Sequence, residues 1–267
     1  MPEGDTIART AAVLREALVG RRVTAARAQP GPGIRRVPCM ERVIGATVAR
    51  VESRGKHLLI GFDNGLTLRT HLRMTGSWHR YRPGERWRLP AHSATVAIET
   101  AEAVAVCFNA PTAELLTPTD LTRHFRLNAL GPDLLATDFE PDIAVARLRA
   151  RPAAEIANAL LDQEALAGIG NVYKSEVLFL ERTNPWTDVS ALSDERLHAI
   201  VATVRRLMRA NLRGGARVTT GRRAPDAGLW VYGRAGRPCR RCGTLIRAAR
   251  QGELARTTYW CPRCQPG

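Results

Sequence analysis

The chain has 267 residues and a large excess of positive charge, with 40 Lys and Arg residues against 25 Asp and Glu residues, a formal net charge of +15. Such a charge favours a polyanionic partner, nucleic acid above all. A membrane surface is the alternative, but no apolar run approaches the roughly 18 residues of a spanning helix, and the polar start lacks a signal-peptide core. We therefore expect a soluble, cytoplasmic protein of one large domain or two ordinary ones.

The chain starts Met1-Pro2-Glu3. Removal of Met1 would expose the secondary amine of Pro2 next to a carboxylic acid. A terminal amine titrates near 8, below lysine, and a secondary amine that condenses with an aldehyde gives a permanently charged iminium. The start is therefore a candidate reaction centre. The alternative is an ordinary solvated chain end, because many proteins begin Met-Pro.

The first predicted element is a helix that follows this start. Ile7, Ala11, Leu14 and Leu18 share one helical face, Gly20 ends the pattern, and Asp5 is the expected N-cap. The N-terminus is then anchored by a packed helix.

Strand patterns fill the chain from about residue 23 to residue 128. Residues 56–62 and 66–72 flank Asp63-Asn64-Gly65 and predict a hairpin, and residues 94–99 and 103–108 predict further strands. The expected N-terminal domain, residues 1–129, is a β-sandwich with a flanking helix.

Two residues of this strand region have side chains of special interest. Lys56 is one of only two lysines, the other being Lys174, so an amine rather than any cation is indicated there. Met74 follows a strand in Thr70-His71-Leu72-Arg73-Met74-Thr75-Gly76. It is either a core residue or an exposed wedge of the kind that fills the gap left by an extruded base.

Helical spacing replaces the strand pattern after a polar connector at residues 130–141, and it predicts helices over residues 142–228. Gly168-Ile169-Gly170-Asn171 lies between two of these helices. Glycines, free helix N–H groups and an Asn side chain suit a grip on a DNA phosphate. An ordinary tight turn is the alternative. Residues 213–229, rich in Gly and Arg, predict a mobile loop.

Four cysteines near the C-terminus form two C-x-x-C pairs, Cys239 with Cys242 and Cys261 with Cys264. Their spacing predicts one structural Zn²⁺ held by four thiolates in a β-hairpin, residues 229–267. Free thiols or a redox pair are the alternatives. A deaminase zinc site is excluded, because no H-x-E motif accompanies Pro238-Cys239. The isolated Cys39 and Cys107 are expected in the core.

These motifs together resemble the bacterial Fpg/Nei family of bifunctional DNA glycosylases. The resemblance runs nearly end to end and includes several motifs in the same order: Pro2-Glu3-Gly4, Gly55-Lys56-His57, Leu130-Gly131-Pro132, Leu161-Asp162-Gln163, Gly168-Ile169-Gly170-Asn171, Val231-Tyr232-Gly233-Arg234 and the four-cysteine finger. It implies an α+β fold in which a β-sandwich precedes a helix–two-turn–helix domain and a zinc-finger hairpin.

The resemblance also implies residue roles. Pro2 would attack C1′ of a damaged nucleotide, Glu3 would protonate the sugar ring oxygen, and Lys56 would contact the adjoining phosphate. Asn171 and Arg256 would grip phosphates, whereas Met74 and Arg73 would fill the space of the flipped nucleotide. The implied partner is damaged DNA, bound as a duplex by a monomer.

Several features bear on the branch of the family and on its activity. Pro2-Glu3-Gly4 resembles the endonuclease VIII branch, which acts on oxidised pyrimidines, and residues 104–113 lack the long Arg-x-Phe loop of the formamidopyrimidine branch. Met74 resembles the formamidopyrimidine branch instead, and Thr6 stands where both branches usually have an acid. An 8-oxoguanine glycosylase and a catalytically silent DNA-binding protein are therefore the alternatives.

Overall fold

The computed structural model describes residues 2–30, 37–222 and 227–267, and its contacts divide the chain into two units, Met1–Asn128 and Ala129–Gly267. Each unit is described by itself. Residues 223–226, within the loop predicted over 213–229, lie outside the described residues. Among the described residues no helix is long and apolar enough to cross a membrane.

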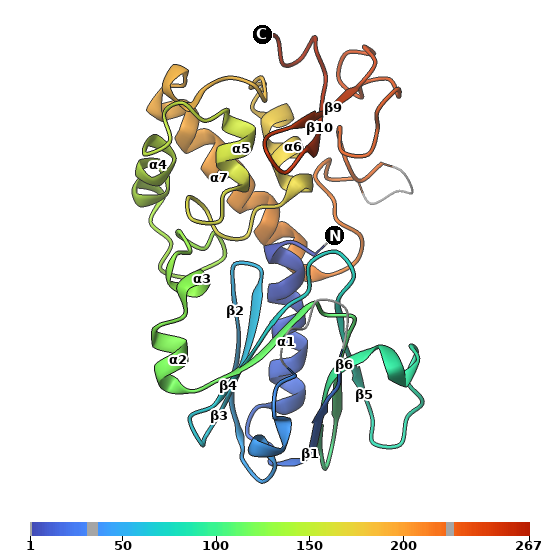
Figure 1. Ribbon diagram of the computed structural model, residues 1–267. Coiled ribbons are helices and arrows are strands. Elements are labelled where there is room, and N and C mark those ends of the chain that lie inside the picture. The colour runs from blue at the N-terminus through green and yellow to red at the C-terminus, as the bar shows by residue number, and fades with distance from the viewer. Residues whose placement is uncertain (1, 31–36, 223–226) are drawn as a thin grey trace. The chain divides into compact units, whose positions relative to one another are not determined.

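The first unit contains two antiparallel four-stranded sheets, with strand orders β2-β3-β4-β8 and β1-β6-β7-β5. Figure 1 shows helix α1 lying between them. The strands are β1 (Val23–Ala28), β2 (Val48–Arg54), β3 (His57–Phe62), β4 (Thr67–His71), β5 (Ser77–Tyr81), β6 (Ala94–Thr100), β7 (Val104–Phe108) and β8 (Thr112–Leu116). The predicted β-sandwich with a flanking helix is confirmed.

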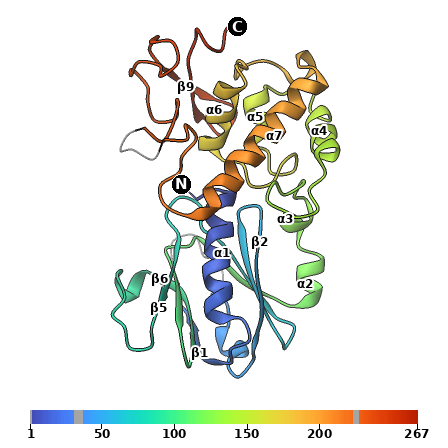
Figure 2. The same ribbon diagram turned by 180° about the vertical axis from the view of Figure 1, so that it is seen from behind.

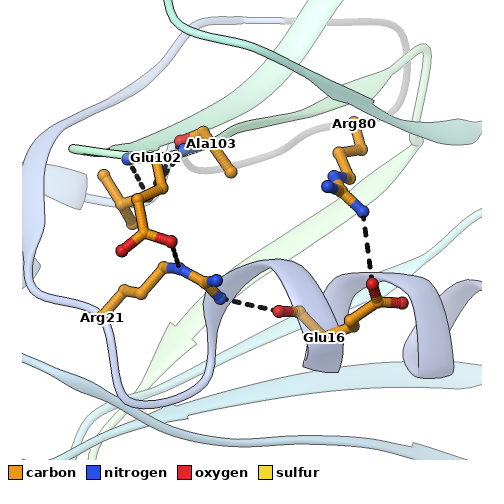
Figure 3. Close-up of polar contacts among 6 residues, drawn as sticks. Glu16, Arg21, Arg80, Glu102 and Ala103 are labelled. Atoms are coloured by element: carbon orange, nitrogen blue, oxygen red, sulfur yellow. Dashed lines mark hydrogen bonds and ion pairs between the residues drawn. The ribbon is translucent and has the colours of Figure 1, made fainter.

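Helix α1 (Gly4–Leu18) packs the predicted face, Ile7, Ala11, Leu14 and Leu18, into a core shared by both sheets. Polar contacts hold its C-terminal end (Figure 3). Arg21 Nε donates to Glu102 Oε2 at 2.7 Å and Arg21 Nη1 to the Glu16 carbonyl at 2.6 Å, whereas Arg80 lies 3.9 Å from the Glu16 carboxylate. Because these contacts are solvent-exposed, they add little to stability.

Two predictions about this unit are wrong. Asp5 does not cap α1, because the helix begins at Gly4 and Glu3 is the N-cap residue. Asp5 instead lies in the first turn, where its Oδ1 accepts a hydrogen bond from Thr6 N at 2.7 Å. Cys107 is buried as expected, but Cys39 is exposed, since it precedes a short 3₁₀ turn (Met40–Val43) rather than lying in a strand.

The second unit is mainly helical and ends in a hairpin. Short helices α2 (Pro118–Thr122) and α3 (Phe125–Asn128) close the first unit; the second contains α4 (Pro141–Arg149), α5 (Ile156–Leu161), α6 (Asn171–Leu180), α7 (Asp194–Ala210), β9 (Arg247–Gln251) and β10 (Arg256–Trp260). Helix α7 buries Leu197, Ile200, Val201, Val204 and Leu207 as its spacing predicts. Helix α4 buries Ala144, Val145 and Leu148, so Ile143 faces solvent.

Candidate functional site

Pro2 and Glu3 lie at the start of α1 in the first unit. The Glu3 carbonyl accepts the first helical hydrogen bonds, from Thr6 N at 2.9 Å and Ile7 N at 3.1 Å. The Glu3 side chain is fully buried, whereas Pro2 is half-buried. The positive end of the helix dipole disfavours a protonated amine, so a free Pro2 amine at this position would be a better nucleophile.

The other sequence-predicted residues of this unit lie at the same end of it. Arg15 Nε donates to the Val51 carbonyl, and Gly20 N donates to the Val48 carbonyl, so α1 runs antiparallel to β2. From Arg15 back to Gly4 the helix rises about 16 Å. The same distance along β2 from Val51, at about 3.3 Å per residue, reaches the turn that contains Lys56. Figure 1 shows this turn beside the start of α1.

Lys56 is presented by a two-residue hairpin turn between β2 and β3. Arg54 pairs with His57 across the turn, and Gly55 has φ 57°, a conformation that a side chain disfavours. Lys56 itself is half-buried.

Met74 lies at the tip of the β4–β5 turn and is 60% exposed, so the core interpretation of this residue is wrong. His71 pairs with His57, which places this turn at the same end of the sheet as Lys56. Gly76 N donates to the Leu72 carbonyl at 2.9 Å, and a Cβ at Gly76 would lie 2.7 Å from that oxygen. The tight turn holds Met74 away from the core, and Arg73 beside it has φ 47°.

A polar cluster around the buried side chains of His57, which follows Lys56, and Arg69 was not anticipated from the sequence. Arg69 Nη2 lies 3.1 Å from His57 Nδ1, and its Nη1 donates to Glu114 Oε2 at 2.5 Å. Arginine only donates, so His57 Nδ1 accepts and the ring is neutral. Burial, followed by the Arg69 charge, lowers the pKa of His57 to about 2, and the same two causes lower the pKa of His71 to about 4.

In the second unit Asn171 begins α6, and Gly170 is its N-cap residue. Gln163 shapes the preceding turn, because its Nε2 donates to the carbonyls of Leu161 and Ile169 and its Oε1 accepts from Gly168 N. Gly168 has φ 104°. The predicted helix–turn–helix is therefore confirmed, and the N-terminus of a ten-residue helix follows this turn, an end that favours an anion.

The Asn171 side chain is fixed by the hairpin. Its Nδ2 donates to the Thr257 carbonyl at 2.6 Å, while its buried Oδ1 has no hydrogen-bond partner among the described residues. An amide nitrogen has two hydrogens, so a second N–H remains to meet an anion. Arg256, the neighbour of Thr257, is exposed at the start of β10. The structure thus places Asn171 and Arg256 on adjoining elements.

A second unanticipated residue, Glu176, binds Thr219 and the backbone of residues 230–232. Its carboxylate accepts hydrogen bonds from Trp230 N at 2.7 Å, from Val231 N and Tyr232 N at 2.8 Å, and from the Thr219 hydroxyl. Complete burial raises the pKa of Glu176, and these hydrogen bonds oppose the rise. No sequence signal reveals such a carboxylate, because its partners are 43 to 56 residues away.

The four cysteines come before and after the β9–β10 hairpin and form a compact site, with all their sulfur atoms within 4.8 Å of one another. Sγ atoms of Cys239 and Cys264 are 3.9 Å apart, and those of Cys242 and Cys261 are 3.5 Å apart. A tetrahedral zinc site with Zn–S bonds of about 2.3 Å separates its sulfurs by about 3.8 Å. The cluster therefore fits one zinc ion, and four thiolates leave no open position, so the ion is structural.

Comparison with known proteins covers the whole chain. Family models match residues 1–113 (formamidopyrimidine-DNA glycosylase N-terminal domain), 130–222 (formamidopyrimidine-DNA glycosylase H2TH domain) and 236–267 (zinc finger found in FPG and IleRS). A probable endonuclease 8 2 of Streptomyces coelicolor is 45% identical over 272 residues, which cover 100% of this chain and 95% of that protein. The chain belongs to the Fpg/Nei family.

A further relative and a solved structure also match nearly the whole chain. The DNA-(apurinic or apyrimidinic site) lyase Nei2 of Mycolicibacterium smegmatis is 42% identical, with 99% of each chain covered. Among solved structures, the Lactococcus lactis formamidopyrimidine-DNA glycosylase bound to abasic-site DNA has a TM-score of 0.82 at 24% identity, over 99% of this chain and 100% of that one. At that identity the likeness establishes the shared fold. The predicted family, α+β class and zinc site are thereby confirmed.

Proposed function

We propose that this protein is a bifunctional DNA glycosylase and abasic-site lyase that excises oxidised pyrimidines from duplex DNA. The supporting observation is that Pro2, Glu3, Lys56 and Met74, remote in sequence, share one end of the first unit. The second unit would hold the DNA by its phosphates, through Asn171 and Arg256. We propose that the protein works as a monomer in the bacterial cytoplasm, at the nucleoid.

The proposed reaction begins when the free Pro2 nitrogen bonds to C1′ and the bond between C1′ and the damaged base breaks. The base leaves with the electrons of that bond and takes up the proton that the Pro2 nitrogen releases. Glu3 protonates the ring oxygen as the C1′–O4′ bond breaks, which leaves an iminium between Pro2 and C1′. The positive charge acidifies the 2′ hydrogen, so loss of that proton expels the 3′ phosphate. Loss of the 4′ proton then expels the 5′ phosphate, and water releases the sugar fragment from Pro2.

Lys56, Arg73 and Met74 have supporting roles in this proposal. The Lys56 ammonium neutralises a phosphate beside the lesion and so favours the extruded nucleotide. Extrusion costs a few kcal/mol of stacking, and the exposed Met74, with Arg73 beside it, fills the resulting gap. The basic surface offsets the remaining cost through phosphate contacts.

The preference for pyrimidines rests on the short connection between β7 and β8. Strand β7 ends at Phe108 and β8 begins at Thr112, so there is no room for a long loop that probes the orphaned base. The second candidate substrate is 8-oxoguanine, because two of the matching family models are those of formamidopyrimidine-DNA glycosylase and because Met74 resembles that branch.

Borohydride trapping tests both the mechanism and the substrate. The protein with a free Pro2 is incubated with duplexes that contain thymine glycol, 5-hydroxycytosine, 8-oxoguanine or an abasic site, and the adduct is mapped by mass spectrometry. The chain has only two lysines, and Lys174 is 1% exposed, so Lys56 is the lysine that DNA can reach. The mapped peptide then shows whether the adduct is at Pro2 or at Lys56.

We expect trapping at Pro2, with the pyrimidine lesions cleaved faster than 8-oxoguanine. Protein that retains an N-terminal tag is the matched control and should give no adduct. Faster cleavage of 8-oxoguanine would reassign the substrate. DNA binding with no adduct and no strand scission would instead identify a catalytically silent damage-binding protein.

A further inference from the structure

Lys174 is a buried lysine that the proposed reaction does not use. It lies on α6, one turn after Asn171, and its side chain is 1% exposed. Taking an ammonium group out of water costs several kcal/mol unless hydrogen bonds and an opposite charge compensate. In a chain with 38 arginines and only two lysines, a buried amine at this position calls for a specific explanation.

A directed chain of hydrogen bonds leads from this ammonium to a carboxylate. Lys174 Nζ donates to Thr258 Oγ1 at 2.7 Å, and Thr258 Oγ1 donates to Gln251 Oε1 at 2.6 Å. Gln251 Nε2 then donates to Glu155 Oε2 at 2.7 Å and to the Pro185 carbonyl at 3.0 Å. Because ammonium only donates and carboxylate only accepts, both charges orient the hydroxyl and the amide the same way.

This chain joins three elements of the second unit. Lys174 belongs to α6, Thr258 and Gln251 to the β9–β10 hairpin, and Glu155 precedes α5. Thr258 and Gln251 are 0% and 5% exposed, so water does not compete for their hydrogen bonds. Both views of the molecule show α6 beside the hairpin (Figures 1 and 2).

The turn of the β9–β10 hairpin also packs against α5. Gly252 follows β9, and a Cβ there would lie 2.5 Å from Asn158 Oδ1. The Asn158 amide in turn donates to Glu155 Oε2 at 2.8 Å. The carboxylate that ends the hydrogen-bond chain is thus also bonded to the residue against which the hairpin turn packs.

We propose that Lys174 is a positioning residue that locks the β9–β10 hairpin onto α6, so that Asn171 and Arg256 meet the DNA backbone as one rigid surface. The inference rests on the proposed function for its DNA-binding consequence. The lock itself follows from adjoining contacts: Lys174 bonds to Thr258 while Asn171 bonds to the carbonyl of Thr257. Preorganisation of this kind lowers the entropic cost of binding two phosphates at once.

Hydrogen exchange of the DNA-free protein tests the lock. Lys174→Met keeps the unbranched shape and removes the charge, and Thr258→Val breaks the chain midway with little change of shape. Both variants should exchange the amides of residues 247–260 at least about tenfold faster, with α7 unchanged. Zinc content should stay at one ion per chain. Unchanged hairpin exchange in both variants would overturn the lock, whether or not the protein binds DNA.

Affinity for abasic duplex DNA tests the consequence. Lys174→Met should bind about tenfold more weakly, as expected for one lost charge-assisted contact, and the slope of log K against log salt should fall by about one. The double variant with Arg256→Ala should bind no worse than Arg256→Ala alone. Additive losses, or faster exchange with wild-type affinity, would overturn the role in binding. Failure of the wild-type protein to bind or cleave DNA would instead refute the proposed function.

Discussion

Acidification should destabilise the first unit through the buried His57. In the native state Arg69 donates to His57 Nδ1, and burial together with the Arg69 charge lowers the pKa of His57 to about 2. The other groups that face the ring, His71, His124 and Arg126, act in the same direction. In the unfolded chain a histidine titrates near 6.5. Between these pKa values the unfolded state binds one more proton than the native state.

The sign and size follow directly from this difference. Stability rises with pH wherever the unfolded state binds more protons, so the contribution is complete above about pH 6.5 and is lost as the pH falls below it. At pH 5, about 1.5 units below the unfolded pKa, the loss is about 2 kcal/mol at about 1.36 kcal/mol per unit. The half-buried His71, whose pKa is about 4, adds a loss of the same sign and of nearly the same size, because pH 5 also lies above its native pKa.

Urea unfolding followed by far-UV circular dichroism at pH 7 and pH 5 measures this loss. His57→Gln retains an acceptor for Arg69 without a titrating ring, and it should flatten the pH dependence by about 2 kcal/mol. His92→Gln, at an exposed histidine outside the cluster, is the matched control. If His57→Gln and the wild-type protein lose equal stability between pH 7 and pH 5, the account of a buried neutral His57 is incorrect.

Three further substitutions give separate tests. Cys261→Ser should release the zinc ion, measured by atomic absorption, because three thiolates do not close the tetrahedral site; full retention of zinc would contradict this. Glu176→Gln should cost about 2–4 kcal/mol in urea unfolding, since an amide nitrogen would face buried N–H donors; an unchanged midpoint would contradict it. Met74→Ala should slow base excision about tenfold and spare abasic-site cleavage; equal slowing of both would argue against a wedge.

Local features of this protein were predictable because their physics acts over a few residues. The apolar positions of α1 and α7 repeat with the helical period, so the buried faces followed from spacing alone. The spacing of the two C-x-x-C pairs is typical of a tetrahedral zinc site, so the four ligands could be predicted from the sequence. The hairpin around Asp63-Asn64-Gly65 followed from turn chemistry, and Gly61 pairs with Thr67 across it.

Exact ends and exposures were less predictable. Asp5 satisfies the rules for an N-cap, yet the N-cap residue is Glu3, two residues earlier, because the Glu3 carbonyl already accepts from Thr6 and Ile7. Met74 suited either a core or a surface position, and the turn closed between Leu72 and Gly76 decided for the surface. In both cases a neighbouring backbone contact outweighed the residue type.

By itself the sequence determined the zinc ligands, the helical faces, the strand-rich first half and the residues that carry the family resemblance, since each depends on spacing along the chain. Only the tertiary structure decided which distant polar groups meet. Arg69 reaches Glu114 across 45 residues, and Lys174 reaches Thr258 across 84. A buried charge needs hydrogen-bond partners, and the fold brings these partners together from distant parts of the chain. Such pairs follow no regular spacing in the sequence, so they could not be predicted from it.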